Sequence, residues 1–282
     1  MDVLLDGGTF FECPRWHGGR WWVSDFYSTT VRSFGADGGD QVEEVVVDGR
    51  PSGLGFTPDG DLLVVSMLDH RVLRRSAAGG PLVEVADLSA QVTGICNDMV
   101  VDASGVAWVG EFGFDFFAGA AFAPAVLSRV AADGTVTVAA RDLAFPNGAV
   151  VTDDGSTLIV GETFASRYTA FTVAGDGTLT DRREWAALPG AFPDGCCLDA
   201  RGRIWSADAR SGRCLLVEEG GRVVDEVTVP GGLHAFACML GGPERRTLLV
   251  CAAPDSDPAK RSVATEALLA IVDVDVPGAG LP

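Results

Sequence analysis

Short apolar segments recur along the chain, and a polar residue stands before each of them. Four copies are clear, each with an apolar segment, a tight turn and a second apolar segment, and they begin at Ser52, Asn97, Asn147 and Asp194. In all four, the turn glycine lies eight residues after the polar residue. Glycine at such turns allows the positive φ that reverses a strand tightly. Each copy therefore predicts a buried first strand, a hairpin turn and a second strand.

Two further copies extend this repeat to both ends of the chain. Glu12 begins a slightly shorter copy that turns at Gly18 and Gly19, and His234 stands eight residues before Gly242. The six marked positions are separated by 40, 45, 50, 47 and 40 residues, and 282 residues divided by six give 47. Strand units repeated at this period are typical of β-propellers. We therefore predict an all-β fold, a six-bladed β-propeller of four-stranded blades, as a single domain over residues 1–282.

The ends of the chain and two insertions complete this prediction. Residues 267–274 are expected to pair with residues 3–5, so that the N-terminal strand closes the ring and leaves no open sheet edge. Residues 112–124 and 253–265 interrupt the repeat and should both emerge on the face where the first strands begin. The first insertion is expected to form a wall or lid over the central mouth; an ordinary long loop is the alternative.

The marked positions predict a polar site in the central channel, because the first strand of each propeller blade lines that channel. Glu12, Asn97, Asn147 and Asp194 offer two carboxylates and two amide oxygens, which suit one divalent ion such as calcium. Zinc is less favoured because no pair of thiolates or imidazoles has zinc-site spacing; magnesium and manganese stay open. Any one Asn-Gly or Asp-Gly pair is more often a turn former, so the prediction rests on the shared register.

Further roles can be assigned around the expected metal ion. Asp194 or His234 could activate water, while Asn97 and Ser52 are expected to contact the substrate. Four acidic residues end the second strands: Asp25, Glu111, Glu162 and Asp208. We expect them to form a solvated rim, with orientation of the metal ligands as the alternative.

Composition narrows the classes of partner. Lys and Arg number 21 against 39 Asp and Glu, so the formal charge is 21 − 39 = −18. No basic cluster is present, which argues against nucleic acid and membrane surfaces as partners. No segment has the pattern of a signal peptide or the length of a membrane span.

Seven cysteines without CxxC spacing predict reduced thiols and a cytoplasmic protein. We expect the protein to be a monomer or a homodimer. No G-x-S-x-G occurs, which disfavours a covalent serine hydrolase.

At several of these residues the chain resembles the senescence marker protein (regucalcin), gluconolactonase and luciferin-regenerating enzyme family. The matching segments are Glu12-Cys13-Pro14-Arg15-Trp16, Asn97-Asp98 with Val101 to Gly105, Pro146-Asn147-Gly148 and Pro193-Asp194-Gly195. The resemblance implies a six-bladed propeller with one divalent metal held by Glu12, Asn147 and Asp194, and with Asn97 as a ligand or substrate contact. It also implies hydrolysis of lactones or related esters with Asp194 as the base.

One residue departs from the sugar-lactone members of that family. They carry an arginine two residues before the position of Asn97, where this chain has Ile95. This difference favours a more apolar lactone or ester. His234 resembles a histidine of the related diisopropyl fluorophosphatase and paraoxonase propellers, which leaves a phosphotriester side activity open.

The sequence therefore predicts a metal-dependent hydrolase of a small-molecule lactone or ester. Two alternatives stay open at this point. The same metal site could serve an isomerase, lyase or cyclase acting on a specialised metabolite. The ring could also belong to a non-catalytic propeller that binds calcium or another ligand.

Overall fold

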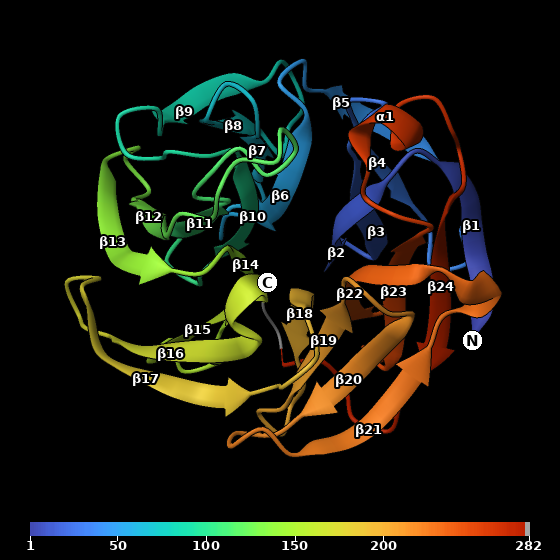
Figure 1. Cartoon of the computed structure of the whole chain (residues 1–282). Helices are drawn as coiled ribbons and strands as arrows, with labels where there is room; N and C mark the ends of the chain where they lie inside the picture. Colours follow the sequence, from blue (N-terminus) through green and yellow to red (C-terminus); the bar gives the residue numbers. More distant parts are fainter. Residues whose placement is uncertain (280–282) are drawn as a thin grey trace.

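The computed structural model describes residues 1–279 and contains six four-stranded antiparallel sheets arranged around a central axis (Figure 1). From the axis outward, the first three blades are β2(Phe11–His17), β3(Arg20–Asp25), β4(Thr30–Phe34), β5(Val42–Val46); β6(Pro51–Phe56), β7(Leu62–Ser66), β8(Arg71–Arg75), β9(Val83–Asp87); and β10(Cys96–Val101), β11(Ala107–Glu111), β12(Ala125–Val130), β13(Val136–Leu143). The fold is the predicted six-bladed β-propeller.

The remaining blades repeat this arrangement. They are β14(Pro146–Val151), β15(Thr157–Glu162), β16(Arg167–Val173), β17(Leu179–Ala187); β18(Pro193–Leu198), β19(Ile204–Asp208), β20(Arg213–Val217), β21(Val223–Thr228); and β22(His234–Gly241), β23(Thr247–Ala253), β24(Ala267–Asp273), β1(Asp2–Gly8). Two short 3₁₀ turns, η1(Thr163–Ala165) and η2(Pro230–Gly232), and one four-residue helix, α1(Pro258–Arg261), lie between strands. No helix among the described residues is long and apolar enough to cross a membrane.

The N-terminal strand closes the ring as predicted. β1 pairs antiparallel with β24, with Val3 opposite Ala270 and Leu5 opposite Leu269. The outermost strand of the sixth blade therefore comes from the other end of the chain. This pairing joins the two ends of the propeller through backbone hydrogen bonds.

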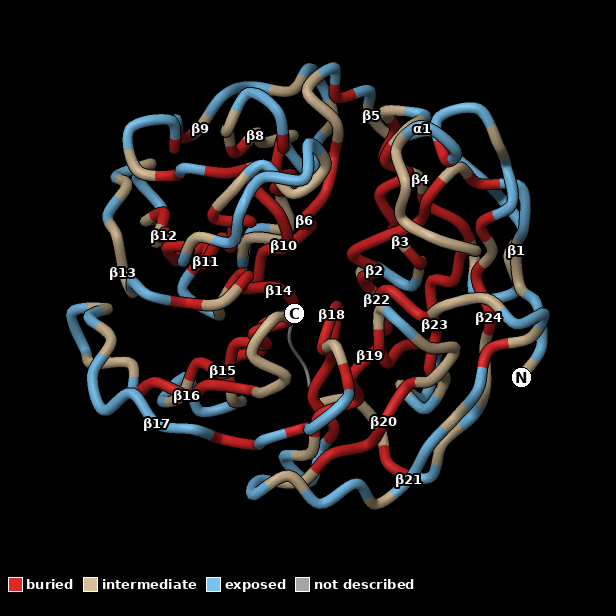
Figure 2. The backbone as a smooth tube through the Cα atoms, in the orientation of Figure 1, coloured by how far each residue is buried: buried red, intermediate tan, exposed pale blue. Residues whose placement is uncertain are grey.

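The core lies between the blades, close to the axis. Every residue of β10, β14 and β18 is buried, whereas the outer strands β17 and β21 are largely exposed (Figure 2). Trp108 of the third blade belongs to the same buried cluster as Val151 and Val160 of the fourth. Because removing apolar area from water stabilises a fold by about 25 cal/mol per Å², such contacts fix adjacent blades against each other and set the geometry of the channel.

Three glycines allow the first strands to approach one another around the channel. A Cβ on Gly148 would lie 2.5 Å from the carbonyl oxygen of Asp194, and one on Gly195 would lie 2.5 Å from Cβ of Ala237. At Gly53 the distance to the backbone nitrogen of Met99 would be 2.6 Å. The Asn147-Gly148 and Asp194-Gly195 pairs therefore lie within strands, not in turns, and their glycines serve close packing.

Candidate active site in the central channel

Each blade has an equivalent position at the top of its first strand, which we call the ring position. The last residue of the second strand pairs with a residue of the first strand. The ring position is the next residue along the first strand. Glu162 pairs with Pro146, so the ring position of that blade is Asn147. The same rule gives Glu12, Ser52, Asn97 and Asp194 in four other blades. The register predicted from the sequence is therefore present in five blades.

The sixth blade differs from the prediction by one residue. His234 pairs with Ala253, so the ring position is Ala235, and the assignment of His234 to the ring register is wrong. The reason is that the turn after β22 comes one residue earlier. Seven residues separate Ala235 from Gly242, against eight in four other blades. His234 nevertheless lines the central cavity, where it is partly exposed and 6.2 Å from the ring of Phe236.

Four ring residues, Glu12, Asn97, Asn147 and Asp194, meet at the base of one cavity, and we call them the polar ring. Each keeps only 7% of its surface exposed. Asn97 Nδ2 donates to Asn147 Oδ1 at 3.1 Å, and Asn147 Nδ2 donates to Thr163 Oγ1 at 3.2 Å. These bonds fix the orientation of both amides, so their oxygens hold defined positions beside the two carboxylates.

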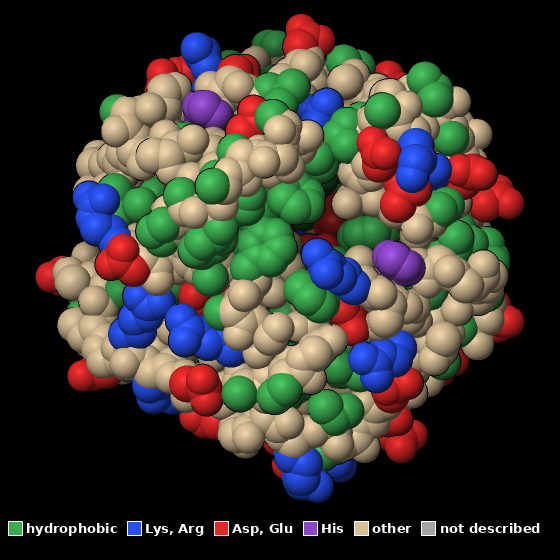
Figure 3. All heavy atoms as spheres, viewed as in Figure 1, with side chains coloured by type: hydrophobic (Ala, Val, Ile, Leu, Met, Phe, Trp, Pro, Cys, Tyr) green, Lys and Arg blue, Asp and Glu red, His purple; other side chains and the backbone are tan. Residues whose placement is uncertain are grey.

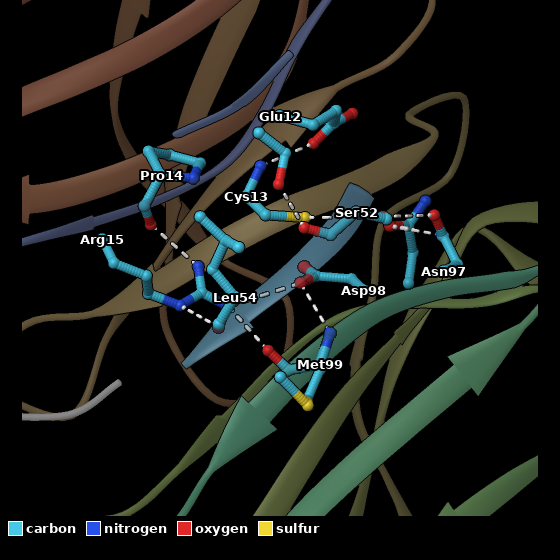
Figure 4. Close-up of polar contacts among 11 residues, drawn as sticks. Glu12, Cys13, Pro14, Arg15, Ser52, Leu54, Asn97, Asp98 and Met99 are labelled. Atoms are coloured by element: carbon cyan, nitrogen blue, oxygen red, sulfur yellow. Dashed lines mark hydrogen bonds and ion pairs between the residues drawn. The ribbon is translucent and has the colours of Figure 1, made fainter. Parts of the chain in front are cut away.

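Ser52 is fully buried and does not line the cavity. Its hydroxyl donates to Asn97 Oδ1 at 3.5 Å (Figure 4). The structure therefore places Ser52 behind the cavity surface, in contact with the amide of Asn97.

A buried ion pair lies next to the polar ring (Figure 4). The Arg15 guanidinium is 3.3 Å from the Asp98 carboxylate and donates to the carbonyl oxygens of Leu54 and Met99 at 2.8 and 2.6 Å. Both side chains of the pair are at least 95% buried. If Glu12, Asp98 and Asp194 are all ionised, the single charge of Arg15 leaves two negative charges without a partner.

This excess charge perturbs both carboxyls of the polar ring. Burial, followed by the charges of Asp194 and Asp98, raises the pKa of Glu12 well above its usual value. Burial and the charge of Asp98 raise the pKa of Asp194 in the same direction. Desolvation and like charges both disfavour the ionised form. A cation at the polar ring would remove this penalty.

The donor set fits a hard divalent ion such as calcium. Glu12 and Asp194 supply carboxylate oxygens and Asn147 an amide oxygen, the donor types that calcium uses. Within residues 1–279, no group of three or more His, Cys, Asp or Glu side chains is placed to hold a metal. The polar ring itself has only two such residues, because the other two are asparagines.

The cavity above the polar ring has a volume of about 420 Å³ and an apolar side. Nine phenylalanines line it, and we call them the aromatic wall: Phe10, Phe26, Phe112, Phe116, Phe117, Phe145, Phe164, Phe192 and Phe236. Figure 3 shows hydrophobic side chains gathered around the central hollow, with acidic side chains in its depth. The volume is within the range of small-molecule sites.

Both insertions emerge on the predicted face of the propeller, and both contribute residues to this cavity. Phe112, Phe116 and Phe117 come from the first, which forms part of the wall. Asp255 and Ser256 come from the second.

The rest of the aromatic wall was missed at the level of sequence, although a signal was present. Phe10, Phe145 and Phe192 each stand two residues before a ring position. In the third blade the same position is Ile95. A search of the sequence for side chains that repeat at this offset would find three of the wall residues.

The four acids at the ends of the second strands are buried, so the prediction of a solvated rim is wrong. They accept hydrogen bonds from backbone N–H groups just before the first strand of their own blade: Phe10 to Asp25 (3.0 Å), Gly94 to Glu111 (2.7 Å), Ala144 to Glu162 (2.7 Å) and Phe192 to Asp208 (3.1 Å). Through these contacts the acids fix the backbone segments that lead into the polar ring.

The cysteines near the polar ring are poor nucleophiles. All seven cysteines are buried and free. Burial, with the charges of Asp98 and Glu12, raises the pKa of Cys13 well above its usual value. A buried thiol in an acidic environment stays protonated and unreactive.

Comparison with known proteins agrees with this architecture. Residues 10–254 match the model of a family described as the SMP-30/Gluconolactonase/LRE-like region. Among curated relatives, pentonolactonase XacC of Haloferax volcanii is 28% identical over 253 residues, covering 86% of this chain and 81% of that protein. A 6-deoxy-6-sulfogluconolactonase of Pseudomonas putida is 32% identical over 127 residues, covering 44% of this chain. Lactonase drp35 of Staphylococcus aureus is 28% identical over 195 residues, covering 64% of this chain. The match spans only 43% and 57% of the latter two proteins.

Solved structures share the fold. A luciferin-regenerating enzyme superposes with a TM-score of 0.82 at 17% identity, over 99% of this chain and 97% of that one. Regucalcin of Agrobacterium tumefaciens, described as a calcium-binding protein, gives 0.79 at 22% identity, over 98% and 96%. A gluconolactonase of Xanthomonas campestris gives 0.76 at 23% identity, over 96% and 89%. At these identities the likeness concerns the fold alone.

Proposed function

The chain belongs to the SMP-30/gluconolactonase/LRE-like family, and on that basis we propose that it hydrolyses a lactone or related ester with one divalent metal ion in its central channel. One observation carries the proposal. Four oxygen-bearing side chains from four blades, two of them buried carboxyl groups, meet at the base of a small-molecule-sized cavity. Relatives named as lactonases support the reaction class.

Glu12, Asn147 and Asp194 would hold the ion, with Asn97 as a further ligand or a contact to the substrate. Calcium fits this donor set best, and magnesium, manganese or zinc are the alternatives for elemental analysis to decide. When bound, a divalent ion supplies a Lewis acid for the substrate carbonyl.

The chain's own residues supply proton transfer and orientation. Asp194 accepts a proton from the attacking water as the new C–O bond forms. That proton then goes to the ring oxygen as the lactone C–O bond breaks, so water is consumed and a hydroxy acid is released. His234, at the side of the cavity, is the second candidate for this role.

The amide of Asn97 is held by Ser52 and by Asn147, so its orientation is set before a ligand enters. The aromatic wall limits the water that reaches the polar ring. A limited water supply favours one positioned nucleophile over bulk solvent.

Elemental analysis and isotope labelling together test the proposal. We expect one divalent ion per chain in the purified protein, its loss in Asn147→Ala, and its retention in Gln91→Ala, an amide outside the cavity. A panel of apolar lactones and esters is then incubated in ¹⁸O-water, and the hydroxy acid products should carry the label. Absence of metal from the unmodified protein, or turnover without label, would refute the metal-dependent hydrolase; unlabelled turnover indicates an isomerase, lyase or cyclase.

A further inference from the structure

The aromatic wall selects the body of the ligand. The wall contains nine of the chain's 15 phenylalanines. Phe145 stacks on Phe112 with ring centroids 4.3 Å apart and meets Phe164 at 4.9 Å, so these three rings form one continuous surface. Phenylalanine offers no hydrogen bond to a hydroxyl group. A hydroxyl group buried there without a hydrogen-bond partner is disfavoured, whereas an aromatic or alkyl group gains by losing contact with water.

One cation lies at the cavity without an acidic partner. Three charged or titratable side chains accompany the polar ring in lining the cavity: Arg210, His234 and Asp255. Asp255 is already paired, 3.3 Å from Arg261 and 3.4 Å from Lys260. Arg210, in contrast, has no carboxylate within ion-pair distance and no side-chain hydrogen bond among residues 1–279.

The guanidinium of Arg210 is nonetheless held in place. It lies over the ring of Phe192, 4.2 Å from the centroid. A guanidinium stacked on an aromatic face keeps its N–H groups free to bind an anion that lies in the plane of the guanidinium. In a chain with a formal charge of −18, an unpaired, oriented arginine at the cavity is a specific feature rather than part of a basic surface.

From these observations we infer that the substrate is a lactone or ester with an aromatic or alkyl body and an anionic group, a carboxylate, that Arg210 binds. The inference rests on the proposed function for the position of the reacting carbonyl. That carbonyl lies at the polar ring, the apolar body lies along the aromatic wall, and the carboxylate lies against Arg210. A polyhydroxylated sugar lactone fits neither the wall nor the single cation.

Binding of lactams tests the inference separately from turnover, because a lactam keeps the ring carbonyl and resists hydrolysis. The probes are 4-(5-oxopyrrolidin-2-yl)benzoate, its neutral carboxamide, and gluconolactam, titrated calorimetrically into the calcium-saturated protein. We expect the benzoate to bind about fivefold more tightly than the carboxamide, a ratio typical of an exposed ion pair. Gluconolactam should bind at least tenfold more weakly than either aryl lactam.

Arg210→Gln should abolish the preference for the benzoate and leave carboxamide binding unchanged. Arg222→Gln, which removes the same charge from an exposed hairpin (72% exposed), should keep the preference. Equal binding of benzoate and carboxamide, or a preference that survives Arg210→Gln, would refute the carboxylate contact. Gluconolactam binding as tight as that of the aryl lactams would refute the apolar body. If the lactam preferences hold but no lactone is hydrolysed, the ligand class stands and the proposed reaction fails.

Discussion

The polar ring and the aromatic wall share one cavity but are built in different ways. The polar ring comes from a single structural position repeated in four blades. The wall combines residues just before the first strands with the first insertion, with Phe164 in η1, with Phe26 after β3 and with Phe236 in β22. The polar ring is thus placed by the repeat, whereas the wall is placed partly by a recurring position of the repeat and partly by segments that interrupt it. Loops on a rigid scaffold can change without disturbing the scaffold.

Buried acids connect the two regions. Glu111 accepts backbone N–H groups of Gly94 and Gly113 through one oxygen and of Val126 through the other, at 2.7, 2.9 and 3.0 Å. It therefore joins the segment before Asn97 to both ends of the first insertion. The second and sixth blades have Ser66 and Ala253 in place of an acid, and their ring residues do not line the cavity.

The largest expected effect lies in the polar ring. Asp194→Asn keeps the size of the side chain and removes the proposed base, so kcat/KM on a lactone that the protein hydrolyses should fall about 10³-fold. Relative preference among substrates should stay the same, because the wall is untouched. Steady-state kinetics with circular dichroism as a fold control measures this. Asp153→Asn, in an exposed turn, should retain full activity; full activity in Asp194→Asn would remove Asp194 from the mechanism.

Glu111→Gln should disturb both regions at once. The glutamine amide would turn its own N–H group toward a backbone N–H group that now donates to the carboxylate. The lost hydrogen bond should lower the free energy of unfolding by about 2 kcal/mol. Urea denaturation measures the loss. Calcium affinity and KM should both worsen, since the ring segment and the insertion share this carboxylate. Glu219→Gln, on the surface at 60% exposure, is the control, and a change in only one of the two properties would show that Glu111 does not couple them.

Removing one phenyl ring from the aromatic wall should change substrate selectivity and leave metal binding unchanged. Phe164→Ala is expected to raise KM for an aryl lactone about tenfold by removing apolar contact area, with metal content unchanged. Phe122→Ala removes a ring of the same aromatic cluster that is 56% exposed and does not line the cavity, and should leave KM as it is. Loss of bound metal in Phe164→Ala would contradict the separation of the two regions.

The smallest effect is a pH dependence confined to the polar ring. In metal-free protein the pKa values of Glu12 and Asp194 are raised on folding. Their contribution to stability is therefore fully present below about pH 4, the unfolded value, and is lost as pH rises through the folded-state pKa values.

Melting temperatures in EDTA at pH 5 and pH 7.5 measure this contribution. We expect the wild type to lose about 3 °C more than the Glu12→Gln/Asp194→Asn double variant between the two pH values. Calcium should restore the wild type at pH 7.5 and not the double variant. An identical pH response of both proteins would mean that these carboxyls are not perturbed in the folded state.

The sequence by itself determined the six-bladed architecture, the closing strand and five of the six ring positions. It could do so because turn glycines and apolar strands repeat with the backbone, at a spacing that local chemistry fixes. The same regularity produced the one register error, at His234, where a turn shortened by one residue moved the ring position to Ala235.

Only the tertiary structure decided what surrounds the ring. Contacts between segments far apart in the chain set the burial of Glu111 and its equivalents, the pairing of Arg15 with Asp98 and the stacking of Arg210 on Phe192. The sequence alone does not show whether a charged side chain is solvated or buried. Its environment, and hence its pKa and its partners, is set by packing across blades, which no local pattern records.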